Sequence, residues 1–137
     1  MNKTYFKNTK DIFIIDVNNI NKLIRNSNNK LKRFRQNLHK SFKSKIQEML
    51  IVFRKNSYVQ PHYFKEKNTF FRLVEGKFLI KIYKKKKILK KIKLKNKNEM
   101  VFIKSNTIYD IICLSNKGII QELMNGPFDK KLFKTIN

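Results

Sequence analysis

The sequence predicts an all-β fold, a sandwich or small barrel, with one short helix near the N-terminus. Two observations support this fold class. From Ile46 onward, short apolar runs recur at even spacing and are bounded by Asn, Ser, Gly or Lys. Between Phe78 and Tyr83, and again over residues 91–95, apolar side chains fall on every second position, which is the period of a strand. Many short strands with turn signals between them are typical of sandwiches and small barrels.

The N-terminal part predicts one strand and one helix. The run from Asp11 to Ile15 is apolar enough for a short edge strand. Apolar residues then recur at helical spacing, which predicts a helix that follows a capping Asp16, ends near Arg25 and packs against a sheet. This apolar stripe consists of Val17, Ile20, Leu23 and Ile24. A polar break follows from Asn26 to Asn29.

The rest of the chain predicts a series of strands. The expected strands are Ile46 to Phe53, Tyr58 to His62, Phe70 to Glu75, Phe78 to Tyr83, residues 91–95, Met100 to Ile103, Ile108 to Leu114 and Ile119 to Met124. Pro61 should limit the pairing of its strand, and Gly76 should allow a bend or bulge. We expect one domain over residues 1–137, with an N-terminal extension (1–30), a barrel (31–128) and a tail (129–137).

A dense polar segment runs from Leu31 to Ser41. If it is extended, its alternate residues share one face of the strand. Those residues are Arg33, Arg35, Asn37 and His39. Two guanidinium groups, an amide and an imidazole on one face suit a phosphate or carboxylate, so the segment is a candidate anion-binding site. A solvated strand face is the equal alternative.

The net charge of +24 arises from 33 Lys and Arg residues against 9 Asp and Glu residues. Such a balance is typical of proteins that bind nucleic acid or anionic surfaces. Lys, Asn and Ile are also the residues that AT-rich codons over-supply, and lysines run from Lys3 to Lys134. We therefore favour compositional drift over a selected anionic partner, and we interpret the lysines around the turn at Lys84 to Lys87 as a solvated face.

Cysteine content and hydropathy indicate the cellular compartment of the protein and whether it spans a membrane. Cys113 is the only cysteine, so no disulfide can form within the chain. The first ten residues are polar and no apolar stretch approaches the roughly 20 residues of a membrane span. We expect a cytoplasmic protein without a membrane span.

The stretch from Asn56 to Gly76 resembles the first motif of the cupin superfamily. That motif consists of a glycine, His-x-His, a glutamate and a second glycine, and its histidines and glutamate hold a metal. The spacing is kept here, but only His62 is a ligand type of that set. A second cupin motif would fall at Asn98 to Cys113. The resemblance implies that the four ligand positions carry His62, Phe64, Thr69 and Tyr109.

Several stretches together resemble the WbuC family of cupin-fold metalloproteins. They are Arg33 to Ser41, Gln47 to Leu50, Ser57 to His62, Val74 to Gly76, Ser105 to Thr107, and Glu122 with Gly126 to Phe128. The resemblance implies a small jelly-roll barrel, a divalent transition metal and a role in O-antigen or surface-polysaccharide biosynthesis. Tyrosine and threonine are poor ligands at neutral pH, so we expect a degenerate metal site with His62 as its remaining ligand, and no bound cofactor.

The polar face of residues 33–39 favours a protein that binds a small anionic ligand, and the resemblance implies that this ligand is of the sugar-nucleotide kind. An enzyme of the sugar isomerase or epimerase type is the first alternative. A basic protein that binds nucleic acid or another polyanion is the second. A homodimer is suggested by analogy with other cupins. The sequence has no Gly-rich phosphate loop, nucleophile elbow, CxxC or HExxH motif.

Overall fold

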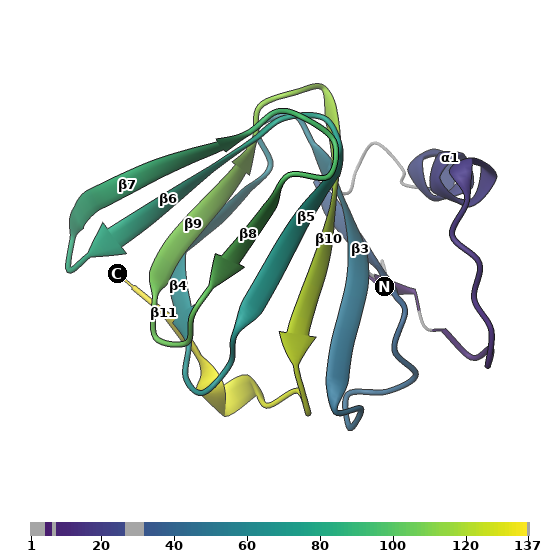
Figure 1. The fold of residues 1–137 in the computed structure, drawn as a ribbon, viewed down its shortest axis with the longest axis horizontal. Coiled ribbons are helices and arrows are strands. Elements are labelled where there is room, and N and C mark those ends of the chain that lie inside the picture. Colours follow the sequence, from purple (N-terminus) through teal and green to yellow (C-terminus); the bar gives the residue numbers. More distant parts are fainter. Residues whose placement is uncertain (1–4, 7, 27–31, 137) are drawn as a thin grey trace.

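Two β-sheets face each other in the computed structural model, which describes residues 5–6, 8–26 and 32–136 (Figure 1). The first sheet holds, in spatial order, β1 (Tyr5–Phe6), β2 (Arg33–Asn37), β3 (Ile46–Arg54), β10 (Lys117–Asn125), β5 (Thr69–Glu75) and β8 (Met100–Ile103). The second holds β11 (Phe133–Thr135), β4 (Tyr58–Phe64), β9 (Ile108–Cys113), β6 (Phe78–Lys84) and β7 (Lys87–Leu94). Among the described residues, every strand pairing is antiparallel except that of β1 with β2. The prediction of an all-β barrel is confirmed.

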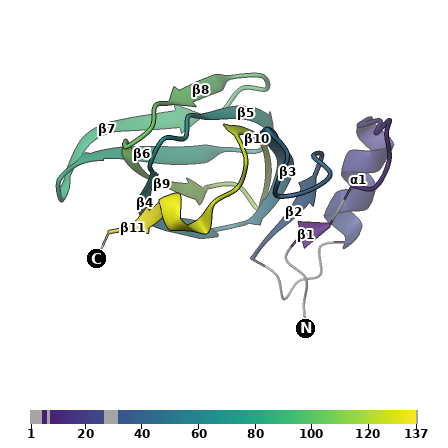
Figure 2. The ribbon, with the colours of Figure 1, turned by 90° about the horizontal axis from the view of Figure 1, so that it is seen from below.

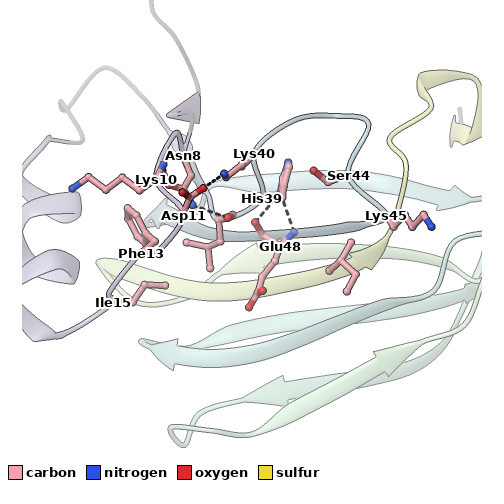
Figure 3. Close-up of a pocket in the computed structure, with 12 residues that line it drawn as sticks. Asn8, Lys10, Asp11, Phe13, Ile15, His39, Lys40, Ser44, Lys45 and Glu48 are labelled. Carbon is pink, nitrogen blue, oxygen red and sulfur yellow. Dashed lines mark hydrogen bonds and ion pairs between the residues drawn. The ribbon is translucent and has the colours of Figure 1, made fainter.

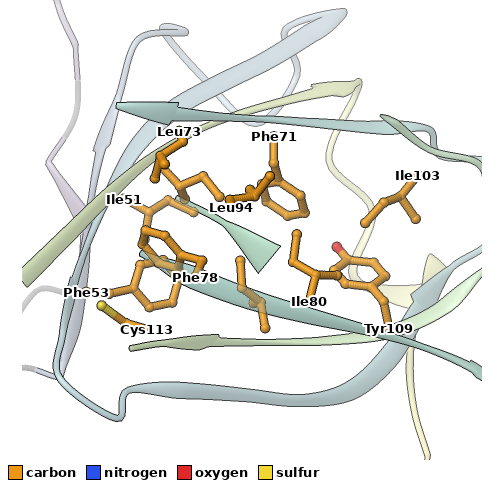
Figure 4. Packing of buried hydrophobic residues seen from close by; sticks show 12 residues of the cluster. Ile51, Phe53, Phe71, Leu73, Phe78, Ile80, Leu94, Ile103, Tyr109 and Cys113 are labelled. Carbon is orange, nitrogen blue, oxygen red and sulfur yellow. The ribbon is translucent and has the colours of Figure 1, made fainter. Parts of the chain in front are cut away.

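The main core fills the space between the two sheets (Figure 4). Period-2 alternation places one face of each strand inward, and Phe53 meets Phe78 edge-on there, with ring centroids 5.1 Å apart. Gly118 makes this contact possible, because a Cβ on it would lie 2.5 Å from Cζ of Phe78. Burial of these apolar side chains is the main stabilising term of the barrel.

The predicted helix is confirmed as α1 (Val17–Asn26). Asp16 caps it as expected: its carboxylate accepts from the Asn19 amide at 2.8 Å, and the Asn19 side chain accepts from the Asp16 amide at 3.3 Å. The apolar stripe packs Leu23 on the outer face of the first sheet, beside Phe34 and Leu50. Within the described residues, no helix has both the length and the apolar character needed to cross a membrane.

The strand expected at Asp11 to Ile15 is wrong. These residues form no strand, and the side chains of Ile12 and Ile14 are 80% and 69% exposed. The edge position beside β2 is taken by β1, so the apolar run has no strand to pair with. The extended segment expected from Leu31 to Ser41 is also shorter, because only Arg33–Asn37 forms a strand. The expected break at Asn26 to Asn29 lies mostly outside the described residues.

The segment expected to be a tail belongs to the second sheet. A short 3-10 helix, Lys130–Leu132, leads into β11, and β11 pairs with β4 in the register Phe133↔Phe64 and Thr135↔His62. Figure 2 shows this segment crossing the end of the barrel. The C-terminal strand therefore forms part of the wall around the barrel interior.

Candidate functional site

Two adjoining cavities lie inside the barrel at the end where β11 crosses. The inner cavity, of about 140 Å³, is lined by side chains that include Arg33, His62 and Tyr109. The mouth cavity, of about 310 Å³, is lined by side chains that include Asn37, His39 and Phe128. The residues that line both are Arg35, Phe64, Glu122 and Phe133. The volume of the mouth cavity lies at the lower end of the range for small-ligand sites.

Seven of the eight candidate site residues line these cavities. The anion-binding candidates face the barrel interior although the strand ends at Asn37, because the chain continues inward as far as His39. Of the four cupin ligand positions, Thr69 does not line a cavity. It is fully buried, and its side chain opposes the rise in the pKa of Tyr109, so it lies behind the wall beside that tyrosine. The structure thus brings the two predicted groups of residues into one site.

Two guanidinium groups dominate the charge of the site. Arg33 Nη1 donates to the Tyr58 carbonyl at 3.0 Å, which ties β2 to β4, while its buried Nε has no partner among the described residues. Burial and the neighbouring Arg35 lower the pKa of Arg33. Within the described part of the chain, no side chain forms a hydrogen bond or ion pair with the Arg35 guanidinium, which is partly accessible from both cavities.

Among the described residues, Glu122 is the one acidic side chain that lines the two cavities. It projects from the central strand β10, and burial raises its pKa while Arg35 and Arg33 oppose that rise. With two guanidinium groups against one carboxylate, the site carries an excess of positive charge. In the sequence, Glu122 is marked only as a lone acidic residue within the apolar strand expected from Ile119 to Met124.

His62 offers a neutral imidazole to the inner cavity. Its Nδ1 lies 2.9 Å from the Gln60 carbonyl, so this nitrogen carries the proton and Nε2 presents its lone pair. Burial lowers the pKa of His62. Its ring packs against Tyr109 and Phe133, with centroid distances of 4.3 and 5.2 Å, which fixes its orientation.

His39 lies between the mouth cavity and an open outer cavity of about 640 Å³ beside the N-terminal segment (Figure 3). Its Nδ1 lies 3.0 Å from the Glu48 amide and 2.9 Å from the Glu48 carbonyl. That carbonyl already accepts from the Leu38 amide, so Nδ1 is best placed to accept from the Glu48 N–H. The proton then sits on Nε2, which is buried and without a partner among the described residues.

The mouth cavity has an aromatic wall, of which the sequence analysis identified only Phe64 as a pocket residue. Phe64 and Phe133 pack at 5.2 Å between centroids, and Phe42 and Phe128 at 5.3 Å. The Phe128 amide also donates to the Phe42 carbonyl at 2.7 Å. These rings come from segments that lie far apart in the sequence, so no local pattern marks them as neighbours. The wall gives the site an apolar surface beside its charged groups.

The donor set at the cupin positions does not fit a transition metal. His62 supplies one nitrogen, Phe64 has no donor atom, and burial raises the pKa of Tyr109 well above its usual value. Among the described residues, no three His, Cys, Asp or Glu side chains come together in a group that could hold a metal ion. The chemistry that these residues can supply is anion binding and proton transfer.

A second polar cluster lies on the outer face of the second sheet. Asp110 is fully buried, and its Oδ2 accepts from the Tyr58 hydroxyl at 3.0 Å and the Tyr83 hydroxyl at 2.6 Å. Lys81 Nζ lies 3.2 Å from the same oxygen. Each of these donors is satisfied within the cluster, so it serves to hold β4, β9 and β6 together.

Residues 15–94 match a known family, the domain of unknown function DUF6016. The chain belongs to the DUF6016 family. No curated protein matches the sequence. The sequence expectation of WbuC-family membership stays a prediction, because the family that matches is DUF6016.

Several solved structures, among them a cupin superfamily protein, are similar in fold to this DUF6016 protein. BH2720 from Bacillus halodurans has a TM-score of 0.68 at 12% identity, covering 90% of this chain and 87% of that one. KdgF from a Halomonas species has a TM-score of 0.60 at 13% identity, covering 73% and 83%. A cupin superfamily protein from Desulfitobacterium hafniense has a TM-score of 0.55 at 17% identity, covering 68% and 76%. The DUF6016 protein is therefore a cupin-type protein by fold.

Proposed function

We propose that this DUF6016 protein binds a small anionic ligand in its barrel, without a metal. The observation that carries the proposal is Arg35, whose guanidinium lines both cavities and has no partner among the described residues. A guanidinium forms strong charge-assisted hydrogen bonds with a carboxylate or phosphate. Such a group would also balance the excess positive charge left by Arg33, Arg35 and Glu122.

The proposed ligand is an anionic sugar derivative such as a sugar nucleotide. The inner cavity has room for one carboxylate or phosphate, and the larger mouth cavity has room for a ring. Asn37 and the Nε2 of His39 supply polar groups at the mouth, and Phe64 and Phe133 supply a surface on which a sugar ring can pack. The resemblance to WbuC proteins supports a role in surface-polysaccharide biosynthesis.

Isothermal titration with sugar nucleotides and sugar phosphates tests this proposal. We expect Arg35→Gln to weaken binding about ten- to hundredfold, which is the loss for charge-assisted hydrogen bonds. Arg25→Gln is the matched control, since it removes the same charge from the exposed end of α1. Equal affinity in wild type and Arg35→Gln, or no binding of any of these ligands, would contradict the proposal.

A metal-free sugar isomerase or epimerase is the second candidate function. His62 presents an unprotonated nitrogen from one sheet, and Glu122 presents a carboxylate of raised pKa from the other. Two such groups can remove a proton from carbon and return it. Incubation of candidate sugars in deuterated water tests this function. Deuterium incorporation that both His62→Gln and Glu122→Gln abolish would support it, and no incorporation by wild type would exclude it.

A further inference from the structure

The β6–β7 hairpin forms a cationic arm that reaches past the rest of the barrel in both views (Figures 1 and 2). Residues 77–95, which contain it, hold 10 lysines and no Asp or Glu. These 19 positions therefore carry 10 of the chain's 33 basic side chains. The positive charge is concentrated on this arm and is not spread evenly over the surface.

Compositional drift does not explain the arm. Drift towards AT-rich codons supplies Asn as well as Lys, yet none of the 17 Asn residues of the chain falls within residues 77–95. Strands disfavour Asn, but the turn of the hairpin does not. Lys85 occupies the first turn position with φ of 57°. Of the four other non-glycine residues with positive φ in the described part of the chain, three are Asn. The turn thus keeps a lysine where the backbone favours Asn or Gly.

The tip of the arm also exposes two aliphatic side chains among its lysines. Ile88 is 48% exposed and Leu89 is 67% exposed. The strand register shifts between Ile82 and Tyr83, which makes Leu89 an extra residue on β7. Lys86 and Lys87 precede this pair, and Lys90 and Lys91 follow it. The arm therefore presents an apolar tip within a cationic surround.

We propose that the β6–β7 arm docks on an anionic lipid surface, with its lysines on the head groups and Ile88 and Leu89 in the interface. Lysines near an anionic bilayer each contribute attraction, and an apolar tip adds burial in the head-group region. The lysines alone would equally suit a nucleic acid, so the exposed aliphatic pair at the tip is the feature that favours a lipid surface. Since Ile82 pairs with Tyr109, the arm stands at the end of the barrel that holds the ligand cavities. Docking would bring that end towards the lipid.

Co-sedimentation with vesicles tests the proposal. We expect wild type to bind phosphatidylcholine vesicles that contain phosphatidylserine and not vesicles of phosphatidylcholine alone. Replacing Lys84, Lys85 and Lys86 by Gln should weaken binding about a hundredfold. The matched control replaces three exposed lysines at the far end of the strands by Gln, namely Lys55, Lys97 and Lys117. This change should weaken vesicle binding less than about threefold, because charges beyond a Debye length are screened.

The aliphatic pair separates a lipid partner from other polyanions. Ile88→Ser with Leu89→Ser keeps the charge and should weaken vesicle binding about tenfold, while binding to heparin and duplex DNA stays unchanged. Equal losses for the two lysine triples would overturn the proposal. Unchanged vesicle binding by the double serine variant would also overturn it. If that variant bound vesicles unchanged and wild type bound duplex DNA more tightly than vesicles, the arm would be assigned to nucleic acid. Ile88 and Leu89 are both exposed, so circular dichroism of the double serine variant should show an intact fold.

Discussion

Arg35 and Glu122 line the same two cavities from strands on either side of β3, yet no ion pair joins them in the described part of the chain. Their charges still interact, since Arg35 is the largest opposing influence on the raised pKa of Glu122. A pair held apart in this way leaves the Arg35 guanidinium available to an anionic ligand, while Glu122 keeps a carboxyl group beside it.

Glu122→Gln should raise the affinity for an anionic ligand. The change removes a negative charge from a buried site, and the lost repulsion corresponds to roughly tenfold in affinity. Titration of the same sugar nucleotides measures it, and Glu75→Gln, at an exposed position, is the control. A fall in affinity would contradict this prediction and would mean that Glu122 accepts a hydrogen bond from the ligand.

His62 should make the barrel less stable in mild acid. Its folded-state pKa lies below the usual 6.5, so the unfolded chain binds more protons in that range and stability falls as the pH drops below about 6.5. Urea unfolding at pH 7.5 and 5.5, which lie on either side of roughly that value, measures the effect. The free energy of unfolding should fall between the two pH values, and the fall should be smaller in His62→Gln by up to about 1 kcal/mol. The same pH dependence in both proteins would show that His62 is not its source.

Tyr58 should ionise only near pH 12. Burial, followed by the hydrogen bond and charge of Asp110, raises its pKa from 10.0 to about 12. The folded state then holds this proton more tightly than the unfolded state, so stability falls as the pH rises from 10.0 to about 12. Tyrosinate absorbance, compared between wild type and Tyr58→Phe, measures the midpoint. Asp110→Asn should lower that midpoint, and an unchanged midpoint would rule out the contribution of Asp110.

Two copies of the chain should associate through the outer face of the first sheet. The rings of Phe70 and Phe102 pack there in a tilted arrangement with their centroids 4.8 Å apart and are 45% and 51% exposed, and Leu123 extends the patch. An uncharged patch on a chain of net charge +24 is a candidate contact between copies. Light scattering should give a dimer for wild type and a monomer for Phe70→Ser with Phe102→Ser. A monomeric wild type would refute the prediction.

The fold was predictable where a pattern is long and local. Alternation over residues 78–83 and again over 91–95 marks the two strands of the β6–β7 hairpin, and the helical stripe around Leu23 marks α1 with its Asp16 cap. The run from Asp11 to Ile15 misled because an apolar run needs a partner strand, and β1 already occupies that edge. The two residues of β1 and the three of β11 are too short for any periodicity to appear.

The site was predictable only in part for the same reason. The alternation from Arg33 to Asn37 placed its side chains on the cavity face, because β2 is a regular strand. His62 and Tyr109 were found by their spacing in the cupin motifs. The aromatic wall of Phe42, Phe128 and Phe133 depends on contacts between loops and a terminal strand, and no sequence spacing encodes such contacts.

The wall formed by β11 links formation of the ligand site to the last steps of folding. The site combines Arg35, from an early strand, with Phe133, from the last one, so it exists only when the ends of the barrel have been brought together. Such long-range closure is slow and comes late in folding. A ligand that contacts both Arg35 and Phe133 would stabilise the completed barrel over every partly folded form. Occupancy of the site would then report that synthesis and folding of the whole barrel are finished.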